Sequence, residues 1–487
     1  MKSNFFLLEK KILYIVLGLV SVFLNSCQTY YFANEEFNNA YRAGNFEFCK
    51  TWLEKHKPGK RSKTKFLYEA NLGMISFIQN EKDASDKAFE QAFLLAEDYQ
   101  KKAGEGVAAL LTNPKRITYH GERYELLLLN YFKAINQLKA NNPENALVEA
   151  RRLIRKLNVL QDQGKKDKYN SDGFILWMVG AVFESVGEIN NAYIYYKKAY
   201  ESYQSGFGNI VKTTAPQQLK YDLIRSAFQA GFDTEGQMFE SKTGLKNQTV
   251  NPENGTALLL WHKGLGPVKD ENRITFHLVK GSGGAITFNN PEFGYSIPFF
   301  LPPGELNNPN RFDNLKIITM ALPKYVNRNW YWQNVNARIN GQRYDFQNAT
   351  NLEEIAKTDL DDRTGRDLAT AISRVAIKQA VQYAATQATE AAIKDGKNDD
   401  KKKNQQANLA GSLVNLAFTI ANTATEVADT RNWQTLPAGI EVLRVSLPPG
   451  KQIIQLEGNG KDGKPMNQTI ELNIVKGQTT VHTIHTF

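Results

Sequence analysis

The hydrophobic pattern of this chain changes at about residue 250 and divides it into a helical half and a β-rich half. From about 30 to 245, apolar residues recur at helical spacing, with Gly or Asn at the breaks. Within this half, 119–138 is apolar nearly all round and is expected to be a central buried helix. After residue 251, short stretches between Gly, Pro and Asn turns predict strands. The expected strands are 257–262, 274–279, 317–322, 331–339, 441–445, 452–457 and 468–475.

A sequence motif with small residues at fixed positions recurs in the helical half. Residues 187–192 (GEINNA), followed by Tyr196 and Ala199, have the spacing of the second helix of a tetratricopeptide repeat. Cys49 occupies the small-residue position of a similar motif, so we interpret this cysteine as a small buried side chain without a catalytic role. The motifs are spaced irregularly, so we expect a degenerate, tetratricopeptide-like (TPR-like) α-solenoid over 27–250.

The β-rich half is interrupted by two expected helices, the first at about 368–393. We interpret Asp359, Asp361 and Asp362 as a capping cluster at the start of this helix, because acids there favour the helix dipole. The predicted fold class is therefore multidomain α + β, with a β-sandwich-like domain after the solenoid. The expected β-rich domain is 251–350 with 428–487, and the inserted helical hairpin is 351–427.

The return helix of the expected hairpin carries an apolar stripe that includes Leu413, Leu416 and Ile420, near a heptad seam. One interpretation packs this stripe on the first helix or on the sheet, and the other makes it a self-association or partner-docking face. Arg374 and Lys378 share one face of the first helix. They either pair with acids of the hairpin or face a partner, and the sequence leaves both alternatives open.

The N-terminus has the features of a secretory signal. Lys10 and Lys11 precede an apolar run over 12–24, too short for a transmembrane anchor of about 20 residues. The run ends in Leu-Asn-Ser before Cys27, which resembles a bacterial lipobox. In such a signal the cysteine receives fatty acyl chains such as palmitate and becomes the first mature residue. We therefore expect 1–26 to be a lipoprotein signal peptide, with a plain signal peptide cut elsewhere as the alternative.

Several acyl chains on Cys27 would anchor the chain stably in a membrane. Gln28 is not the aspartate that retains lipoproteins in the inner membrane of enterobacteria, so we expect the outer membrane. The first acidic residues, Glu35 and Glu36, do not follow Cys27 directly, which favours the periplasmic face over the cell surface.

Neither the composition of the chain nor the spacing of its residues indicates an enzymatic reaction. The net charge of +10 is spread among mixed-sign stretches, which argues against nucleic-acid binding. His482 and His485 are three apart on an expected strand and therefore point to opposite faces. His262 and His277 are expected on neighbouring strands, where they would face each other, but a zinc site needs a third ligand. We expect no catalytic, metal or cofactor site and no enzymatic activity.

Four motifs carry a resemblance to a known family. They are residues 264–269 (GLGPVK), 321–325 (ALPKY), Arg374 with Lys378, and 429–437 (DTRNWQTLP). The chain resembles a family of uncharacterised bacterial envelope lipoproteins with a tetratricopeptide-like N-terminal half. The resemblance implies an envelope lipoprotein, grouped with proteins thought to act in outer-membrane assembly or secretion, and it implies no activity. Trp433 is expected to anchor the return helix to the sheet, with partner binding as its second interpretation.

These features together predict a non-catalytic scaffold, anchored through lipidated Cys27, that binds an envelope protein or peptide partner or associates with itself. The competing hypothesis is a peptidoglycan-binding or peptidoglycan-processing protein whose β-rich domain reads the glycan.

Overall fold

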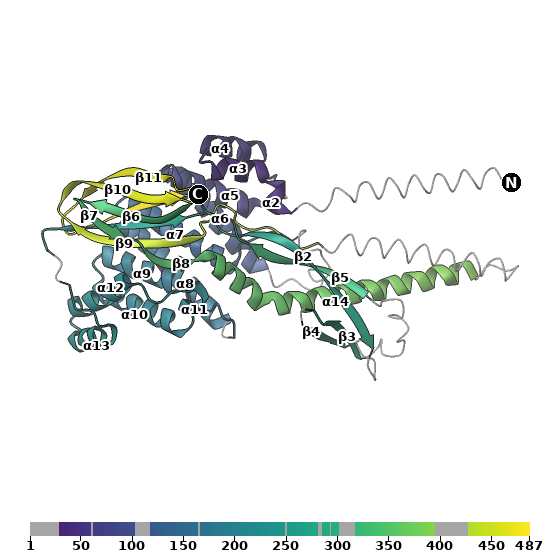
Figure 1. Ribbon diagram of the computed structural model, residues 1–487. Helices are drawn as coiled ribbons and strands as arrows, with labels where there is room; N and C mark the ends of the chain where they lie inside the picture. The colour runs from purple at the N-terminus through teal and green to yellow at the C-terminus, as the bar shows by residue number, and fades with distance from the viewer. Residues whose placement is uncertain are drawn as a thin grey trace.

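The computed structural model describes residues 29–59, 62–102, 117–163, 166–248, 251–280, 285–292, 294–300, 317–394 and 427–487. The fold is mixed α and β, with helices in the N-terminal half and sheets in the C-terminal half (Figure 1). The helices of the first half are α2 (Tyr30–Ala33), α3 (Glu35–Arg42), α4 (Phe46–Lys55), α5 (Lys65–Ile78), α6 (Lys82–Lys102), α7 (Arg123–Lys139), α8 (Pro143–Gln163), α9 (Gly173–Ser185), α10 (Ile189–Ser205), α11 (Phe207–Val211), α12 (Gln217–Gln229) and α13 (Asp233–Thr243).

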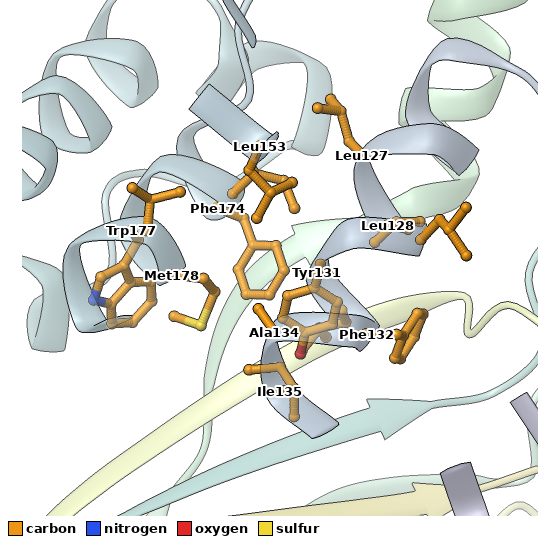
Figure 2. Close-up of a cluster of buried hydrophobic side chains, with 14 of the residues drawn as sticks. Leu127, Leu128, Tyr131, Phe132, Ala134, Ile135, Leu153, Phe174, Trp177 and Met178 are labelled. Carbon is orange, nitrogen blue, oxygen red and sulfur yellow. The ribbon is translucent and has the colours of Figure 1, made fainter. Parts of the chain in front are cut away.

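Helix α7 is the centre of the helical half, which confirms the prediction of a buried helix. It begins with a capping box in which the Glu122 side chain accepts from the backbone of Glu125, and the Glu125 side chain accepts from the backbone of Glu122. Nearly every residue from Tyr124 to Leu138 is buried. A helix buried on all sides must be enclosed by other elements. In Figure 2 Phe174 of α9 packs next to Tyr131 of α7, and Met178 and Trp177 of α9 lie beyond it.

The strands form three four-stranded sheets. Sheet A has the order β12 (Thr479–Thr486), β1 (Gly255–Lys263), β9 (Gly439–Leu447), β8 (Gln347–Asn351). Sheet C has the order β11 (Pro465–Ile474), β10 (Gly450–Gly460), β6 (Trp332–Ile339), β7 (Gln342–Asp345). Sheet B has the order β4 (Tyr295–Phe300), β3 (Ala285–Asn290), β2 (Val268–Lys280), β5 (Ile317–Val326). The seven expected strands are confirmed, whereas β3, β4, β7 and β8 were not predicted.

Strand β1 explains how the two halves meet. Its side chains alternate between the faces of sheet A. Leu258 and Leu260 belong to the large buried cluster of the helices, whereas Ala257 and Leu259 belong to a second cluster shared with sheet C. Sheet A is therefore covered by helices on one face and by sheet C on the other, and its helix-facing side chains belong to the same buried cluster as the helices.

Helix α14 (Leu352–Lys394) starts earlier than expected. The Asn351 side chain accepts the backbone N–H groups of Glu353 (3.1 Å) and Glu354 (3.3 Å), and so caps the helix. Asp361 and Asp362 therefore lie inside the helix, and their interpretation as a capping cluster is wrong. In Figure 1, α14 runs out beside sheet B, against which it buries Leu368 and other apolar residues. The expected return helix lies outside the described residues.

A pair of glycine substitutions tests the helix packing. A Cβ atom on Gly180 of α9 would lie 2.5 Å from the Tyr196 ring of α10, whereas one on Gly365 of α14 would meet nothing within 4 Å. We expect Gly180→Ala to lower the free energy of unfolding by about 1–3 kcal/mol through overpacking. Gly365→Ala should raise it by about 0.5–1 kcal/mol, because alanine is the better helix former. Urea unfolding measures both, and equal effects would contradict the packing.

Candidate functional site

The motif of the family resemblance lies in a buried, extended segment, 428–438, which we call the junction segment. The backbone N–H of Trp433 donates to Glu125 of α7 at 2.7 Å. The Thr435 hydroxyl donates to the Asn71 side chain of α5 at 2.9 Å. The Asn432 amide donates to the Pro267 carbonyl, just before β2, at 2.9 Å. Because one segment bonds to helices and to strands, it ties the two halves together.

A buried acid–base cluster lies beside the junction segment. Glu122, at the start of α7, pairs with Lys269 of β2 and with Arg363 of α14. Burial raises the pKa of the Glu122 carboxyl, but attraction to Arg363 and Lys269 outweighs burial and holds this pKa well below its usual range. Burial and repulsion by Glu122 raise the pKa of Glu125 to about 7. The ion pairs of Glu122 therefore join the start of α7 to β2 and to α14.

The geometry of the junction segment is that of a structural joint. Trp433 is 1% exposed, and its indole N–H donates to the Thr435 hydroxyl at 2.7 Å. The ring packs against Phe66, Phe89 and Phe132 of three helices. Trp433 therefore anchors the junction segment to helices of the N-terminal half, whereas the sequence predicted an anchor between the return helix and the sheet. The buried ring offers no surface to a partner.

The other candidate partner-binding residues are placed as follows. Arg374 is buried on α14, 5% exposed, so it does not form a surface that faces a partner. Lys378 follows one turn later on the same helix. Cys27, Leu413, Leu416 and Ile420 lie outside the described residues, so their roles stay predictions.

The histidine pairing expected from the sequence is wrong. His262 of β1 pairs in register with His485 of β12, with their ring nitrogens 3.5 Å apart, whereas His277 is exposed on sheet B. The Tyr131 hydroxyl of α7 lies 2.9 Å from His262 Nε2. Within the described ranges no group of three or more His, Cys, Asp or Glu side chains is arranged to hold a metal. Cys49 is fully buried, and burial raises the pKa of its thiol to about 12.

Two surface cavities are better placed to meet a ligand. The first, the helical groove, has a volume of about 470 Å³ and lies between α6, α7, α8 and α14. Its apolar lining includes Leu126, Leu127 and Leu160. Its charged lining consists of the cations Arg123, Arg155, Lys156 and Arg366 and the acids Glu97 and Asp167.

The second cavity, the tryptophan cleft, has a volume of about 530 Å³ and opens between sheets A and C. Trp261, Trp330 and Trp332 line it together with polar side chains. The expectations from the sequence did not include this cleft, although the run 329–332 (NWYW) contains two of its three tryptophans. Trp332 lies in the expected strand 331–339 and Trp330 just before it, and strand pattern alone does not place the two rings at one cavity.

The described part of the chain has no helix long and apolar enough to cross a membrane. Comparison with known protein families and with curated proteins found no match for this chain.

Proposed function

We propose that this chain is a lipid-anchored scaffold on the periplasmic face of the outer membrane that holds a protein partner in envelope assembly or secretion. The observation that carries the proposal is the firm attachment of the first described residues to the body of the protein. Thr29 is buried, and the Tyr30 backbone N–H donates to the Thr430 hydroxyl of the junction segment at 2.9 Å.

The attachment limits the reach of an acylated Cys27. Two residues span at most about 7 Å, so an anchor at Cys27 would hold the body directly against the lipid surface. Phe32 of α2 is 52% exposed beside this point, as suits an aromatic ring at a membrane interface. A body held this way presents its other faces at a fixed orientation, which suits a scaffold.

The helical groove is the surface that we propose for the partner. Its apolar floor suits the apolar face of an amphipathic segment. Four cations and two acids line it, and three of these cations already pair with acids: Lys156 with Glu97, and Arg123 and Arg366 with Asp167. Among the ion pairs of the described residues none contains Arg155, so this guanidinium is the cation that an acidic partner would meet. We propose that the partner inserts an acidic, amphipathic segment here.

We propose that the helical half is a tetratricopeptide-like array, because Ala192 and Ala199 of α10 are fully buried at the small-residue positions of the repeat. We also propose that sheets A and C form a sandwich, since they share one buried cluster.

Intact mass and membrane fractionation test the anchor. The native chain is expected to begin at Cys27, to carry the mass of its acyl chains and to sediment with the outer membrane. Cys27→Ala should move the protein to the soluble fraction. A soluble native chain cut at another residue would contradict the anchor.

Photo-crosslinking tests the partner. A benzophenone amino acid at Val159, exposed at the helical groove, is expected to capture one protein from intact envelopes. Val148 is the matched control, because it is equally exposed on the same helix, α8, but does not line the groove. Identical products from both positions, or none from Val159, would contradict docking in the groove.

A further inference from the structure

The residues that line the tryptophan cleft have no part in the proposed scaffold role. Three of the six tryptophans of the chain line this one cavity, so their presence there calls for an explanation other than chance. Trp261 is buried at its base, whereas Trp330 and Trp332 are only partly buried. Partly exposed indole faces are costly in water and are typical of binding surfaces.

Neighbouring residues pack closely against Trp330 and Trp332. Gly264 passes so close to Trp330 that a Cβ atom at 264 would lie 2.6 Å from the Trp330 Cβ. The ammonium group of Lys263 lies 5.7 Å from the Trp330 ring. Trp332 makes an edge contact with Tyr331 at 4.8 Å between ring centroids. A preformed aromatic surface of this kind loses little conformational entropy when a ligand stacks on it.

A β-bulge in the pairing of β6 with β10 places two polar side chains at the same cavity. This pairing shifts register between Glu457 and Asn459, which marks the bulge. Asn334, opposite the shift, has a left-handed backbone with φ of 51°. The bulge breaks the alternation of the strand, and both Gln333 and Asn334 line the cleft with exposed amides. Bulges of this kind occur next to functional sites, where they redirect side chains.

The charges of the cleft are balanced. Lys263 pairs with Glu441, and Arg343 pairs with Asp345 at 3.0 Å. A nucleotide or another anionic ligand would meet as many acids as cations here. The cleft instead suits an uncharged ligand with an apolar face for the rings and a polar edge for amides and charged groups. A sugar ring has both, since its C–H groups form one face and its hydroxyl groups form its edge.

We propose that the tryptophan cleft binds a neutral saccharide, with Trp330 and Trp332 stacking on the sugar and Gln333 and Asn334 bonding to its hydroxyl groups. The site goes beyond the scaffold role and lies on other elements than the helical groove. The cavity volume of about 530 Å³ is ordinary for a small-molecule site. Because all of its walls are strands or strand ends, the site is expected to be preformed.

Calorimetric titration of the detergent-solubilised full-length chain tests the proposal. The probes are the trisaccharides of N-acetylglucosamine, glucose and galacturonic acid, of which only the last is charged. We expect a neutral trisaccharide to bind and the acidic one not to bind. Trp332→Ala should weaken binding at least about tenfold, the loss of roughly one stacking contact. Trp52→Ala is the matched control, because Trp52 is also partly buried but lies on α4.

A second variant keeps the test valid if Trp332→Ala misfolds. Gln333→Ala changes an exposed side chain and should weaken binding several-fold without loss of structure by circular dichroism. Retention on purified sacculi that Trp332→Ala abolishes would assign the ligand to cell-wall glycan. Trisaccharide binding without retention would assign it to another neutral glycan. No binding of neutral trisaccharides at about 10 mM, or equal affinity in Trp332→Ala and the native chain, would overturn the proposal.

Discussion

Replacing Lys269 with methionine is expected to lower the free energy of unfolding by about 3–5 kcal/mol, the usual cost of removing one partner from a buried ion pair. Lys269 is 2% exposed and pairs with Glu122, which is 5% exposed. Without this cation, Glu122 keeps only Arg363, and its repulsion of Glu125 is less compensated. Urea denaturation of the two chains measures the difference directly.

Lys451→Met provides the matched control for this result. Lys451 pairs with Glu471 at 2.7 Å, but both side chains are more than half exposed. Water screens such a pair, so its loss should change stability little. If Lys451→Met and Lys269→Met unfold at the same urea concentration, the buried cluster does not stabilise the joint as we argue.

Replacing His262 with glutamine is expected to make the protein more resistant to acid than the native chain. Burial, with repulsion by Lys139, lowers the pKa of His262 to about 3. Above pH about 6.5 the histidine is neutral in both states and has no pH-dependent effect. Below that pH the unfolded chain takes up a proton that the folded chain rejects, so histidine costs stability as pH falls.

The size of this effect follows from the same pKa values. Between pH about 7 and pH about 4, His262 should cost the native chain about 3 kcal/mol, and glutamine should remove this cost. The measurement is the free energy of unfolding of both chains at several pH values. The difference between the two chains is plotted against pH, because the pH dependence from the carboxyl groups is common to both chains and cancels. His277→Gln, at an exposed position, is the control. A constant difference between His262→Gln and the native chain would contradict a buried neutral histidine.

The neighbours of His262 explain why the site rejects a proton. His485 lies beside it, and burial, with repulsion by His262, lowers its pKa well below the usual range. Burial and repulsion by Lys139 lower the pKa of His482 to about 4. The Lys139 ammonium lies 4.2 Å from the Phe77 ring centroid, and burial lowers its own pKa to about 8. His262 and His485 thus lie at the interface of the helices with sheet A, where both rings contact Phe77 of α5.

The structure gives a physical meaning to two motifs of the family resemblance. Gly266 donates its backbone N–H to Leu436 at 2.7 Å, so the segment before β2 and the junction segment are bonded to each other. Tyr325, at the end of the second motif, bonds to the Tyr124 hydroxyl of α7 at 3.0 Å. Residues far apart in the chain meet at one joint, where they hold helices and strands together. Family membership itself stays a prediction.

Local pattern was sufficient for much of the fold. The apolar run of α7 and the alternating strands β5, β10 and β11 follow from spacing alone, because burial of one face or of all faces leaves a direct trace in the sequence. Local pattern did not predict β7 and β8, which are short, or the start of α14. Asn351 caps this helix, but the many polar residues over 352–362 do not have the apolar pattern of a buried helix. One of them, Asp359, is buried because it pairs with Arg123 of α7, and local pattern cannot show such a contact.

The candidate sites depended on contacts that no local pattern contains. The amino-acid pattern alone predicted the change from helices to strands near residue 250, the buried helix α7, seven strands of the β-rich half and the anchor at Cys27. Tertiary packing was needed to show that His262 pairs with His485 rather than with His277, that Trp433 is buried among three helices, and that Trp330 and Trp332 share a cleft. The reason is physical: periodicity records which side of an element is buried, whereas pairing between distant elements is set by packing and by the burial of charge.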